Sequence, residues 1–366
     1  MERVALIGTG LIGGSIGLGL RRHRPDVHVV GYDSAPATAA RAVARGAVAT
    51  AVDDAPAAVT DADLVVLAVP PGQLEAIATT LRSAVRGDAV VTDVASAKAA
   101  VVAIGQAAFG PRFIGGHPMA GSESHGIEAA DADLFRDAPW ILTPTPQTSS
   151  LAYSAAAELA GTLGSRIVAV DPVEHDALVA RLSHVPQLVS SALVDVAVSA
   201  GDRDAMLGLA GGGFRDVTRI AASDPDLWVS ILRTNRAAVL ESLARVTGSL
   251  DEVGSMITEE KWDDLGRWLA AARRARLELF TRPDHSEDPV ALSLPVPDRP
   301  GVLAEVTTQA GRLGVNIEDL RIVHSTEGGR GRLELVVTGA AGADELVDAL
   351  VGLGYHVDRP GIDFST

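Results

Sequence analysis

Three polar segments of the sequence carry side chains that could do chemistry, and they lie around Ser96, His117 and Arg219. A neutral imidazole can accept a proton near pH 7, and a guanidinium can hold a carboxylate through two hydrogen bonds. A small anionic substrate would need such residues inside a pocket, because the formal net charge of the chain is −16. The first two segments follow expected strands, and ligands of open α/β sheets bind beyond the carboxyl ends of strands. We therefore expect these two segments to meet at one cleft.

A glycine pattern near the N-terminus, formed by Gly8, Gly10 and Gly13, predicts a nucleotide site. It follows an expected strand and opens a helix, as in the dinucleotide-binding fingerprint. The first glycine permits a tight turn, the second lets the backbone approach a pyrophosphate, and the third permits close helix packing. The start of the helix also favours the negative charge of the pyrophosphate. We expect the cofactor to contact the residues of this turn, which are Gly8, Gly10, Leu11, Ile12 and Gly13.

Asp33 indicates which dinucleotide binds. It lies 20 residues after Gly13, at the end of the next expected strand, where a carboxylate can bind both hydroxyls of the adenosine ribose. The same carboxylate would repel a 2′-phosphate, and no arginine follows it immediately. NAD is therefore favoured over NADP. The turn after the strand expected at 64–69 adds Val69 and Pro70 as further contacts of the cofactor.

Residues 1–170 alternate apolar strand-like runs with alanine-rich segments of helical length. Strands that alternate with helices predict parallel βαβ units and a doubly wound, Rossmann-like α/β sheet. The runs are apolar throughout, as expected for strands that helices cover on both faces. The expected strands are residues 4–7, 27–32, 64–69, 89–92, 112–114, 140–142 and 166–169.

Residues 171–282 are expected to form an all-α domain, with helices at 175–200, 227–246 and 262–280. These patterns carry more apolar residues than one solvent-facing helix buries on a single stripe. We therefore expect the helices to pack on one another and on a second subunit of a homodimer. Asp224 and Pro225 predict a helix start, and Pro186 should kink the first helix.

A polar stretch at 281–289, with prolines at 283 and 289, predicts a linker. The following segment, 290–366, has the order strand, helix, two strands, helix and a short closing strand at 355–357. This βαββαβ order predicts a small α+β domain with an antiparallel sheet and helices on one of its faces.

The composition narrows the class of protein further. With no cysteine, the chain has neither disulfides nor a cysteine-ligated metal, and we expect no metal at the site. We find no apolar stretch of the roughly 20 residues that span a bilayer, and no secretion signal at the N-terminus. Acidic residues number 47 against 31 basic ones, which opposes nucleic-acid binding. The expectation is a cytoplasmic protein without a nucleic-acid or membrane partner.

The glycine turn and the three polar segments together resemble the signature set of the prephenate/arogenate dehydrogenase family. The most specific parts are residues 115–123 (GGHPMAGSE) and 211–219 (GGGFRDVTR). The C-terminal segment resembles an ACT domain at residues 298–301 (DRPG) and 316–317 (NI). The two resemblances together cover nearly the whole chain.

The resemblance implies the NAD-dependent oxidative decarboxylation of prephenate to 4-hydroxyphenylpyruvate in tyrosine biosynthesis. Oxidation of the ring carbon that bears the hydroxyl lets the ring carboxylate leave as carbon dioxide, because its loss restores aromaticity. By this likeness His117 would accept the hydroxyl proton, Ser96 would hydrogen-bond the hydroxyl or His117, and Arg219 would hold a substrate carboxylate. Ser122 and Glu123 would line the cleft.

Each of these residues has a structural alternative. His117 could be a turn residue, Ser96 could cap the helix expected at 97–108, and Arg219 could form an ion pair with a nearby aspartate. His175 and His184 lie on the long helix and are by default packing or interface residues.

Gln187 and His184 leave the choice of substrate open. His184 stands shortly before Pro186 and could border the substrate pocket. Some family members have a histidine where Gln187 stands, and that histidine is associated with binding the substrate side chain. Glutamine offers neutral donors and acceptors, so it suits the ammonium group of arogenate as well as a keto acid. Arogenate dehydrogenase, which forms tyrosine directly, is therefore an alternative. His125 stands where a small residue is more usual in the family, and it has no assigned role.

The resemblance to an ACT domain implies an amino-acid effector, with tyrosine as the hypothesis. Gly301 would permit close backbone approach, and Asn316 could hydrogen-bond the ligand; a dimerisation module without a ligand is the alternative. For the whole chain, an amino-acid sensor with an inactive Rossmann domain is a further alternative. A β-hydroxyacid dehydrogenase is disfavoured because such enzymes usually use a lysine of the second domain, and no lysine occurs between Lys98 and Lys261.

Overall fold

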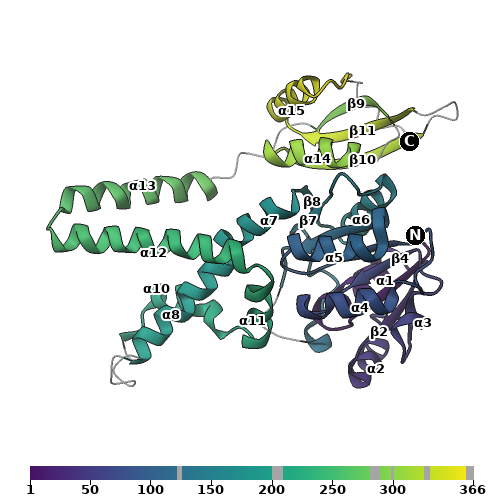
Figure 1. Ribbon diagram of the computed structural model, residues 1–366, viewed down its shortest axis with the longest axis horizontal. Coiled ribbons are helices and arrows are strands. Elements are labelled where there is room, and N and C mark those ends of the chain that lie inside the picture. The colour runs from purple at the N-terminus through teal and green to yellow at the C-terminus, as the bar shows by residue number, and fades with distance from the viewer. Residues whose placement is uncertain (122–125, 200–208, 281–288, 298–300, 325–329, 360–366) are drawn as a thin grey trace. The chain divides into compact units, whose positions relative to one another are not determined.

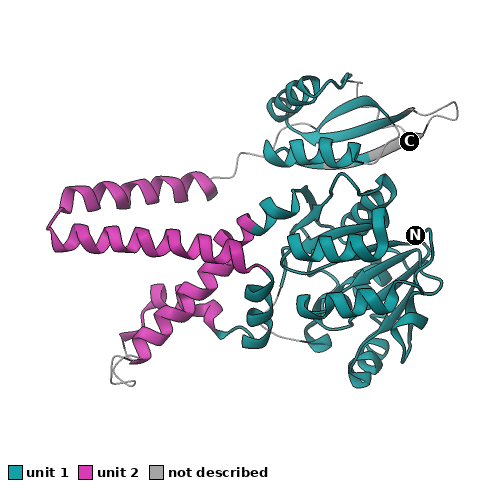
Figure 2. Cartoon of the chain, in the orientation of Figure 1, with its two compact units in different colours: residues 1–176, 222–234, 289–366 teal, residues 177–221, 235–288 magenta. Residues whose placement is uncertain are grey.

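A computed structural model of the chain describes residues 1–121, 126–199, 209–280, 289–297, 301–324 and 330–359 (Figure 1). The contacts divide the chain into two compact units (Figure 2). The first unit contains Met1–Asp176, Ala222–Thr234 and Pro289–Thr366, and the second contains Ala177–Ala221 and Asn235–Asp288.

The first unit is built on an eight-stranded sheet with the order β3-β2-β1-β4-β5-β6-β7-β8. All seven expected strands are present, and the pairs from β3 to β6 are parallel, which confirms the doubly wound α/β prediction. The order reverses between β1 and β4, which is where ligands bind in such folds. The strands are β1 Arg3–Ile7, β2 His28–Tyr32, β3 Thr50–Ala51, β4 Leu64–Leu67, β5 Val90–Asp93, β6 Phe113–Pro118, β7 Pro139–Thr143 and β8 Arg166–Ala169.

Helices cover both faces of this sheet, and each face has its own core. Along β1, Leu6 belongs to one buried cluster, whereas Ala5 and Ile7 belong to the other. Two-sided burial is the reason why the strand sequences are apolar at every position. The helices of this part are α1 Leu11–His23, α2 Pro36–Ala44, α3 Ala55–Val59, α4 Leu74–Leu81, α5 Ala99–Phe109, α6 Ser150–Thr162 and α7 Pro172–Val179, with 3-10 turns at Pro71–Gln73, Gly110–Arg112 and Ile127–Ala129.

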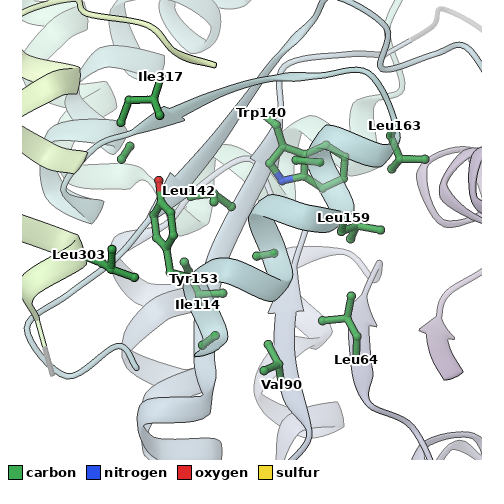
Figure 3. Close-up of a cluster of buried hydrophobic side chains, with 14 of the residues drawn as sticks. Leu64, Val90, Ile114, Trp140, Leu142, Tyr153, Leu159, Leu163, Leu303 and Ile317 are labelled. Carbon is green, nitrogen blue, oxygen red and sulfur yellow. The ribbon is translucent and has the colours of Figure 1, made fainter. Parts of the chain in front are cut away.

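The larger cluster contains the largest buried side chain, that of Trp140, whose ring centroid lies 5.2 Å from that of Phe135. Figure 3 shows Trp140 and Tyr153 in this cluster, with Leu303 and Ile317 from the C-terminal segment. The Tyr153 hydroxyl forms a hydrogen bond with Thr307, and burial raises its pKa. The C-terminal segment therefore packs on the sheet domain through a shared apolar core.

One pair of strands differs from the expected parallel arrangement. β6 and β7 are antiparallel, with His117 opposite Ile141. Antiparallel neighbours need only a loop between them, whereas parallel neighbours need a crossover, and the described residues between these strands contain a 3-10 turn but no α-helix. His117 consequently lies within a strand and not in a turn. The two-residue strand β3 was not predicted, because it is too short to give a pattern.

The second unit is helical, as predicted, but its first helix has an irregular segment. α7 passes through a π-helical segment, Ala180–His184, into α8, Val185–Ser199. The amide of Val185 donates to the carbonyl of Ala180, five residues earlier. Pro186 has no amide hydrogen to donate in the following turn, so a wider turn next to it has a physical reason. The expected disturbance at Pro186 is thus a π segment.

The helix expected at 227–246 is two helices, α11 Pro225–Thr234 and α12 Arg236–Thr258, with Asn235 between them. The start at Pro225 is confirmed, because the Asp224 carboxylate accepts from the amides of Asp226 and Leu227. The described residues of this region also contain α10 Gly212–Thr218, which leads into a 3-10 turn at Arg219–Ala222, and α13 Trp262–Phe280.

Several helices of the second unit expose large apolar side chains, as a protein-binding surface would. The most exposed ones of α8, α12 and α13 are Val196, Val198, Leu240, Leu250, Trp262, Leu269, Leu277 and Leu279. By length and composition alone, the stretch Pro172–Ser199 could also cross a membrane, and 33% of its apolar window is buried. Helices in the cores of soluble proteins meet the same criteria, so this stretch is weak support for a membrane span.

The C-terminal segment forms a three-stranded antiparallel sheet with the order β10-β11-β9. Its elements are β9 Pro289–Pro297, α14 Val302–Arg312, β10 Ile317–His324, β11 Arg330–Thr338 and α15 Ala340–Gly352. The closing strand expected at 355–357 is wrong. Within the described residues, one bridge between Ser293 and Asp358 takes its place. The expected linker at 281–289 lies outside the described residues, except for Pro289 at the start of β9.

Candidate active site

The glycine turn that follows β1 is held by Asp33. The Asp33 carboxylate accepts hydrogen bonds from the amide and the hydroxyl of Thr9, at 2.9 and 3.2 Å, and from the amide of Ala35. Gly8 has a φ of +97°, which an L side chain rarely adopts. The sequence predicted a ribose-binding role for Asp33, and the structure adds that the same carboxylate fixes the shape of the turn.

Gly10 and Gly13 have opposite surroundings. A Cβ on Gly13 would lie 2.0 Å from the carbonyl oxygen of Gly8, whereas a Cβ on Gly10 would have nothing within 4 Å. Gly13 is thus needed for packing, and Gly10 leaves open space in front of the turn where α1 begins at Leu11, followed by Ile12. Beside this turn, Val69 is half-buried and Pro70 is exposed. An open cradle at a helix N-terminus fits the pyrophosphate of a dinucleotide.

His117 and Ser96 lie at the same edge of the sheet as the glycine turn. β1, β4, β5 and β6 are neighbours in parallel, so their carboxyl ends share one edge. His117 is near the end of β6, three strands and roughly 14 Å from the end of β1. The sequence predicted that the segments of Ser96 and His117 share one cleft, and the sheet order supports this prediction.

A buried ion pair, which the sequence did not reveal, braces this edge. Asp93 ends β5, and its carboxylate pairs with the ammonium group of Lys98; neither side chain is exposed. Lys98 also donates to the carbonyl of Gly116 at 2.7 Å, and the amide of Gly116 donates to Asp93 at 3.2 Å. Burial raises the pKa of the Asp93 carboxyl and lowers the pKa of the Lys98 ammonium, while the partner's charge opposes each shift. The pair therefore joins the loop that contains Ser96 to the strand that contains His117.

His117 is the first member of a buried hydrogen-bonded chain. Its Nδ1 lies 2.9 Å from Nε2 of His175, and Nδ1 of His175 lies 2.9 Å from the carboxylate of Asp176. Asp176 in turn accepts from the amides of Lys98 and Ala99 at 2.6 and 2.9 Å. The interpretation of His175 as a packing residue missed this role. A histidine followed by an aspartate at the start of a helix was the available signal.

Ser96 lies half-buried in the loop between β5 and α5. The alternative that it caps the next helix is wrong, because α5 begins at Ala99 and its first amides donate to Asp176. A carboxylate from a distant part of the chain thus replaces the local cap that the sequence suggested. A role for Ser96 in catalysis stays a prediction.

The predicted residues of the second unit have their own polar cluster. His184 is buried, and its Nδ1 lies 3.2 Å from the side-chain nitrogen of Asn235, a residue that the sequence analysis had not named. Gln187 is 5% exposed, and its Oε1 has no hydrogen-bond partner among the residues that the structure describes. Arg219 is exposed at the start of its 3-10 turn. Because His117 belongs to the first unit, its convergence with Arg219 stays a prediction.

Ser122, Glu123 and His125 lie outside the described residues.

Two candidate effector residues lie in the C-terminal segment. Gly301 has a φ of +91° and precedes α14, and a Cβ there would lie 3.1 Å from the carbonyl oxygen of Pro146. Asn316 is half-buried and donates to the Thr338 hydroxyl at 3.3 Å.

A doubly wound sheet with an open glycine turn and a buried histidine at the same edge defines a dinucleotide-dependent oxidoreductase. Two family models match the chain: the nucleotide-binding domain of prephenate dehydrogenase over residues 16–169, and its dimerization domain over residues 171–271. The chain belongs to the prephenate dehydrogenase family, and its cofactor is NAD. This result decides against a β-hydroxyacid dehydrogenase.

The relatives and solved structures agree with this family. The prephenate dehydrogenase of Bacillus subtilis is 32% identical over 342 residues, 91% of each chain. The cyclohexadienyl dehydrogenase of Zymomonas mobilis is 33% identical over 291 residues, 79% of this chain and 99% of the relative. The prephenate dehydrogenase of Aquifex aeolicus, in complex with hydroxyphenyl propionate and NAD+, is 32% identical, with a TM-score of 0.72 over 76% of this chain and 98% of its own. Arogenate dehydrogenase of Synechocystis has a TM-score of 0.67 at 32% identity, over 76% of this chain and all of its own.

The first prediction separates the two glycines of the turn. Gly13→Ala should lower the stability of the NAD-free protein by about 1–3 kcal/mol, because the new methyl group overlaps the Gly8 carbonyl. Gly10→Ala, the matched control, should leave that stability unchanged and weaken NAD binding, because its methyl group occupies the open cradle. Urea unfolding and NAD titration measure the two effects. Equal losses of stability in both variants would contradict the steric argument.

The second prediction concerns the buried ion pair. Lys98→Met should destabilise the protein by about 3–5 kcal/mol, because it leaves the Asp93 carboxylate buried without a counter-charge. The double variant with Asp93→Asn should recover part of this loss, since it removes the uncompensated charge. Arg245→Ala, which breaks an exposed pair with Glu241, is the control and should have little effect on urea unfolding. A double variant less stable than Lys98→Met would contradict this account.

Proposed function

We propose that the protein is an NAD-dependent prephenate dehydrogenase that forms 4-hydroxyphenylpyruvate in tyrosine biosynthesis. The observation that carries the proposal is the 32% identity to the Bacillus subtilis prephenate dehydrogenase over 91% of both chains. The open glycine turn and the buried His117 at one edge of the sheet agree with it. This function requires a working site, which an amino-acid sensor with an inactive Rossmann domain would lack.

The residues of this chain would divide the reaction between them as follows. NAD, bound at the glycine turn and Asp33, supplies the hydride acceptor. His117 accepts the proton of the ring hydroxyl as the ring carbon is oxidised, and Ser96 hydrogen-bonds the hydroxyl or His117. The ring carboxylate then leaves as carbon dioxide, and its electron pair restores the aromatic ring. The proton held by His117 returns to the new phenol oxygen, so that no net proton is released.

Substrate binding is assigned to residues of both units. Arg219 would hold a substrate carboxylate with its planar guanidinium, and Ser122 and Glu123 would line the cleft. His184 and Gln187 would border the substrate side chain, and the Gln187 Oε1 without a partner supports this, because a buried polar atom gains stability from a ligand donor. A substrate ammonium group would provide such a donor.

Arogenate dehydrogenase activity is the second candidate, and the unpartnered Gln187 oxygen is the observation that favours it. The resemblance to the Synechocystis arogenate dehydrogenase structure is consistent with this candidate. NADH absorbance after mixing the protein and NAD with prephenate, and separately with arogenate, tests both. A higher kcat/KM for prephenate supports the main proposal, a higher one for arogenate supports the second, and no NADH from either contradicts both.

The third prediction tests the assigned residues. Arg219→Ala should lower kcat/KM at least thirtyfold, since a lost charged contact with the substrate costs about 2 kcal/mol or more. Arg215→Ala is the matched control on the neighbouring helix and should change kcat/KM less than threefold. His117→Asn should keep NAD affinity and lower kcat by about 10²–10⁴-fold, the contribution of a general base. A change below threefold in Arg219→Ala would remove that residue from the site.

The chain is further proposed to be a cytoplasmic homodimer with three domains. These are an NAD-binding domain at 1–170, a helical dimerisation and substrate domain at 171–282, and a regulatory domain at 290–366. The match of residues 171–271 to a dimerization domain and the exposed apolar side chains of α8, α12 and α13 support the dimer. The same surface accounts for the apolar stretch Pro172–Ser199 without a membrane.

The regulatory domain is proposed to be ACT-like and to bind tyrosine. Its order of elements, βαββα, and its antiparallel sheet agree with this proposal. Asn316 lines a pocket with Arg166, and the two side chains offer an amide and a cation to an amino acid. Gly301 is not among the residues that line this pocket, so its assignment depends on the resemblance alone.

The fourth prediction is that tyrosine binds the intact protein. Calorimetry on the full chain should record heat with tyrosine, and Asn316→Ala should weaken binding because it removes an amide from the pocket. NAD affinity, measured on the same variant, is the control and should not change. The absence of heat at millimolar tyrosine would contradict the effector and favour a dimerisation module without a ligand.

A further inference from the structure

The chain from His117 through His175 to Asp176 has one feature that the proposed reaction does not yet use. Two imidazoles lie in direct hydrogen-bond contact, with 2.9 Å between Nδ1 of His117 and Nε2 of His175. Their rings meet edge to face, with centroids 5.1 Å apart and planes at 69°. A hydrogen bond between two neutral imidazoles needs one protonated and one unprotonated nitrogen at the contact. The third member, Asp176, decides which of the two nitrogens carries the proton.

The order of donors follows from the carboxylate. Asp176 accepts two backbone amides, so its oxygens act as acceptors, and the Nδ1 of His175 at 2.9 Å must carry a proton. A neutral His175 with its proton on Nδ1 has its lone pair on Nε2. The Nδ1 of His117 must then donate to it, which places the lone pair of a neutral His117 on Nε2.

We infer that His175 and Asp176 are positioning residues that hold His117 as the Nδ1-protonated tautomer, with Nε2 as its proton-accepting atom. The inference rests on the proposed function for the identity of the reaction, but the tautomer itself is a property of the structure.

The electrostatic surroundings agree with a neutral His175 and an ionised Asp176. Burial lowers the pKa of His175, and the hydrogen bond to Asp176 opposes this only in part. Burial would raise the pKa of Asp176, but the hydrogen bonds from His175, Lys98 and Ala99 outweigh it and lower that pKa. The other charged groups that act on His175 are Lys98, which disfavours its protonated form, and Asp93, which favours it.

The Nδ1-protonated tautomer of His117 suits a general base in the proposed reaction. When Nε2 of His117 takes the hydroxyl proton, the ring becomes positively charged, and its Nδ1 hydrogen already points at the lone pair of His175. The carboxylate of Asp176 stabilises that charge through His175 without receiving a proton, as a buried carboxylate does behind a catalytic histidine. The proton later leaves by the same nitrogen, so the tautomer is restored after each turnover.

Asp176 also connects the hydrogen-bonded chain of His117 and His175 to the loop that contains Ser96, the other candidate catalytic residue. Its carboxylate holds the amides of Lys98 and Ala99, which follow directly after the loop that contains Ser96. One carboxylate of α7 therefore sets both the ring orientation of His117 and the N-terminus of α5. A packing histidine at position 175 would not need this alignment of donors and acceptors.

The tautomer can be observed directly on the wild-type protein. Nitrogen-15 NMR of histidine-labelled protein at pH 7.5 distinguishes the two ring nitrogens of each of the nine histidines. The signal that disappears in His117→Asn should show a protonated Nδ1 and an unprotonated Nε2. A proton on Nε2 of His117 would overturn the inference. An inactive wild-type protein with the expected tautomer would instead contradict only the proposed function.

Kinetics provides the second test, the fifth prediction. His175→Leu, which has no acceptor for His117, should lower kcat about tenfold, less than the 10²–10⁴-fold that loss of the general base itself would cost. The acid limb of the kcat profile should move to lower pH by about one unit, because protonated His117 loses its hydrogen-bond acceptor and, with it, the link to the carboxylate of Asp176. His175→Gln keeps an acceptor oxygen and should recover part of the rate and of the shift.

The controls separate positioning from folding. NAD affinity should stay unchanged in both His175 variants. His356→Leu breaks an exposed histidine–aspartate pair with Asp358 and should leave the acid limb in place. A wild-type acid limb in a folded His175→Leu protein would contradict the inference. If neither His175 variant folds, the NMR tautomer of the wild-type protein decides.

Discussion

The buried pair of Asp93 and Lys98 is the constraint on which the candidate site depends. Neither side chain is exposed, and a charge taken out of water is stable only beside its partner and with its remaining hydrogen bonds made. The Asp93 carboxylate accepts from the amides of Ala95 and Gly116, and the Lys98 ammonium donates to the carbonyl of Gly116. These bonds hold together the end of β5, the loop that contains Ser96 and the strand that contains His117. Asp176 adds the N-terminus of α5 and the histidine chain to the same framework.

Steric exclusion fixes the glycine turn, whereas a buried ion pair fixes the edge of the sheet at which Ser96 and His117 lie. Gly8 and Gly13 are required because a side chain at either would overlap backbone atoms, whereas the space in front of Gly10 is left open for a ligand. Asp33 is required twice, because it shapes the turn through Thr9 and stands where the ribose of a dinucleotide would lie. One residue thus serves both folding and the choice of cofactor.

The helical unit places polar side chains where an apolar core would be more stable. His184 and Asn235 contact each other, and Gln187 is buried with an oxygen that has no partner in the described part of the chain. A buried oxygen such as that of Gln187 costs stability until a ligand donor pairs with it. The π segment at Ala180–His184 precedes Pro186 and brings His184 into this cluster. Irregular helical turns of this kind often occur at functional sites.

The sequence alone determined what acts over a few residues. The glycine turn, the apolar strands and the capped start of α11 each follow from local sterics and hydrogen bonding, and all three were predicted. Only the tertiary structure decided what joins distant residues, namely His117 to His175, Lys98 to Asp176 and β6 antiparallel to β7. Lys98 has no local pattern that reveals its role, and the sequence His175-Asp176 is only a weak signal, because both roles depend on partners that folding alone brings within hydrogen-bond distance.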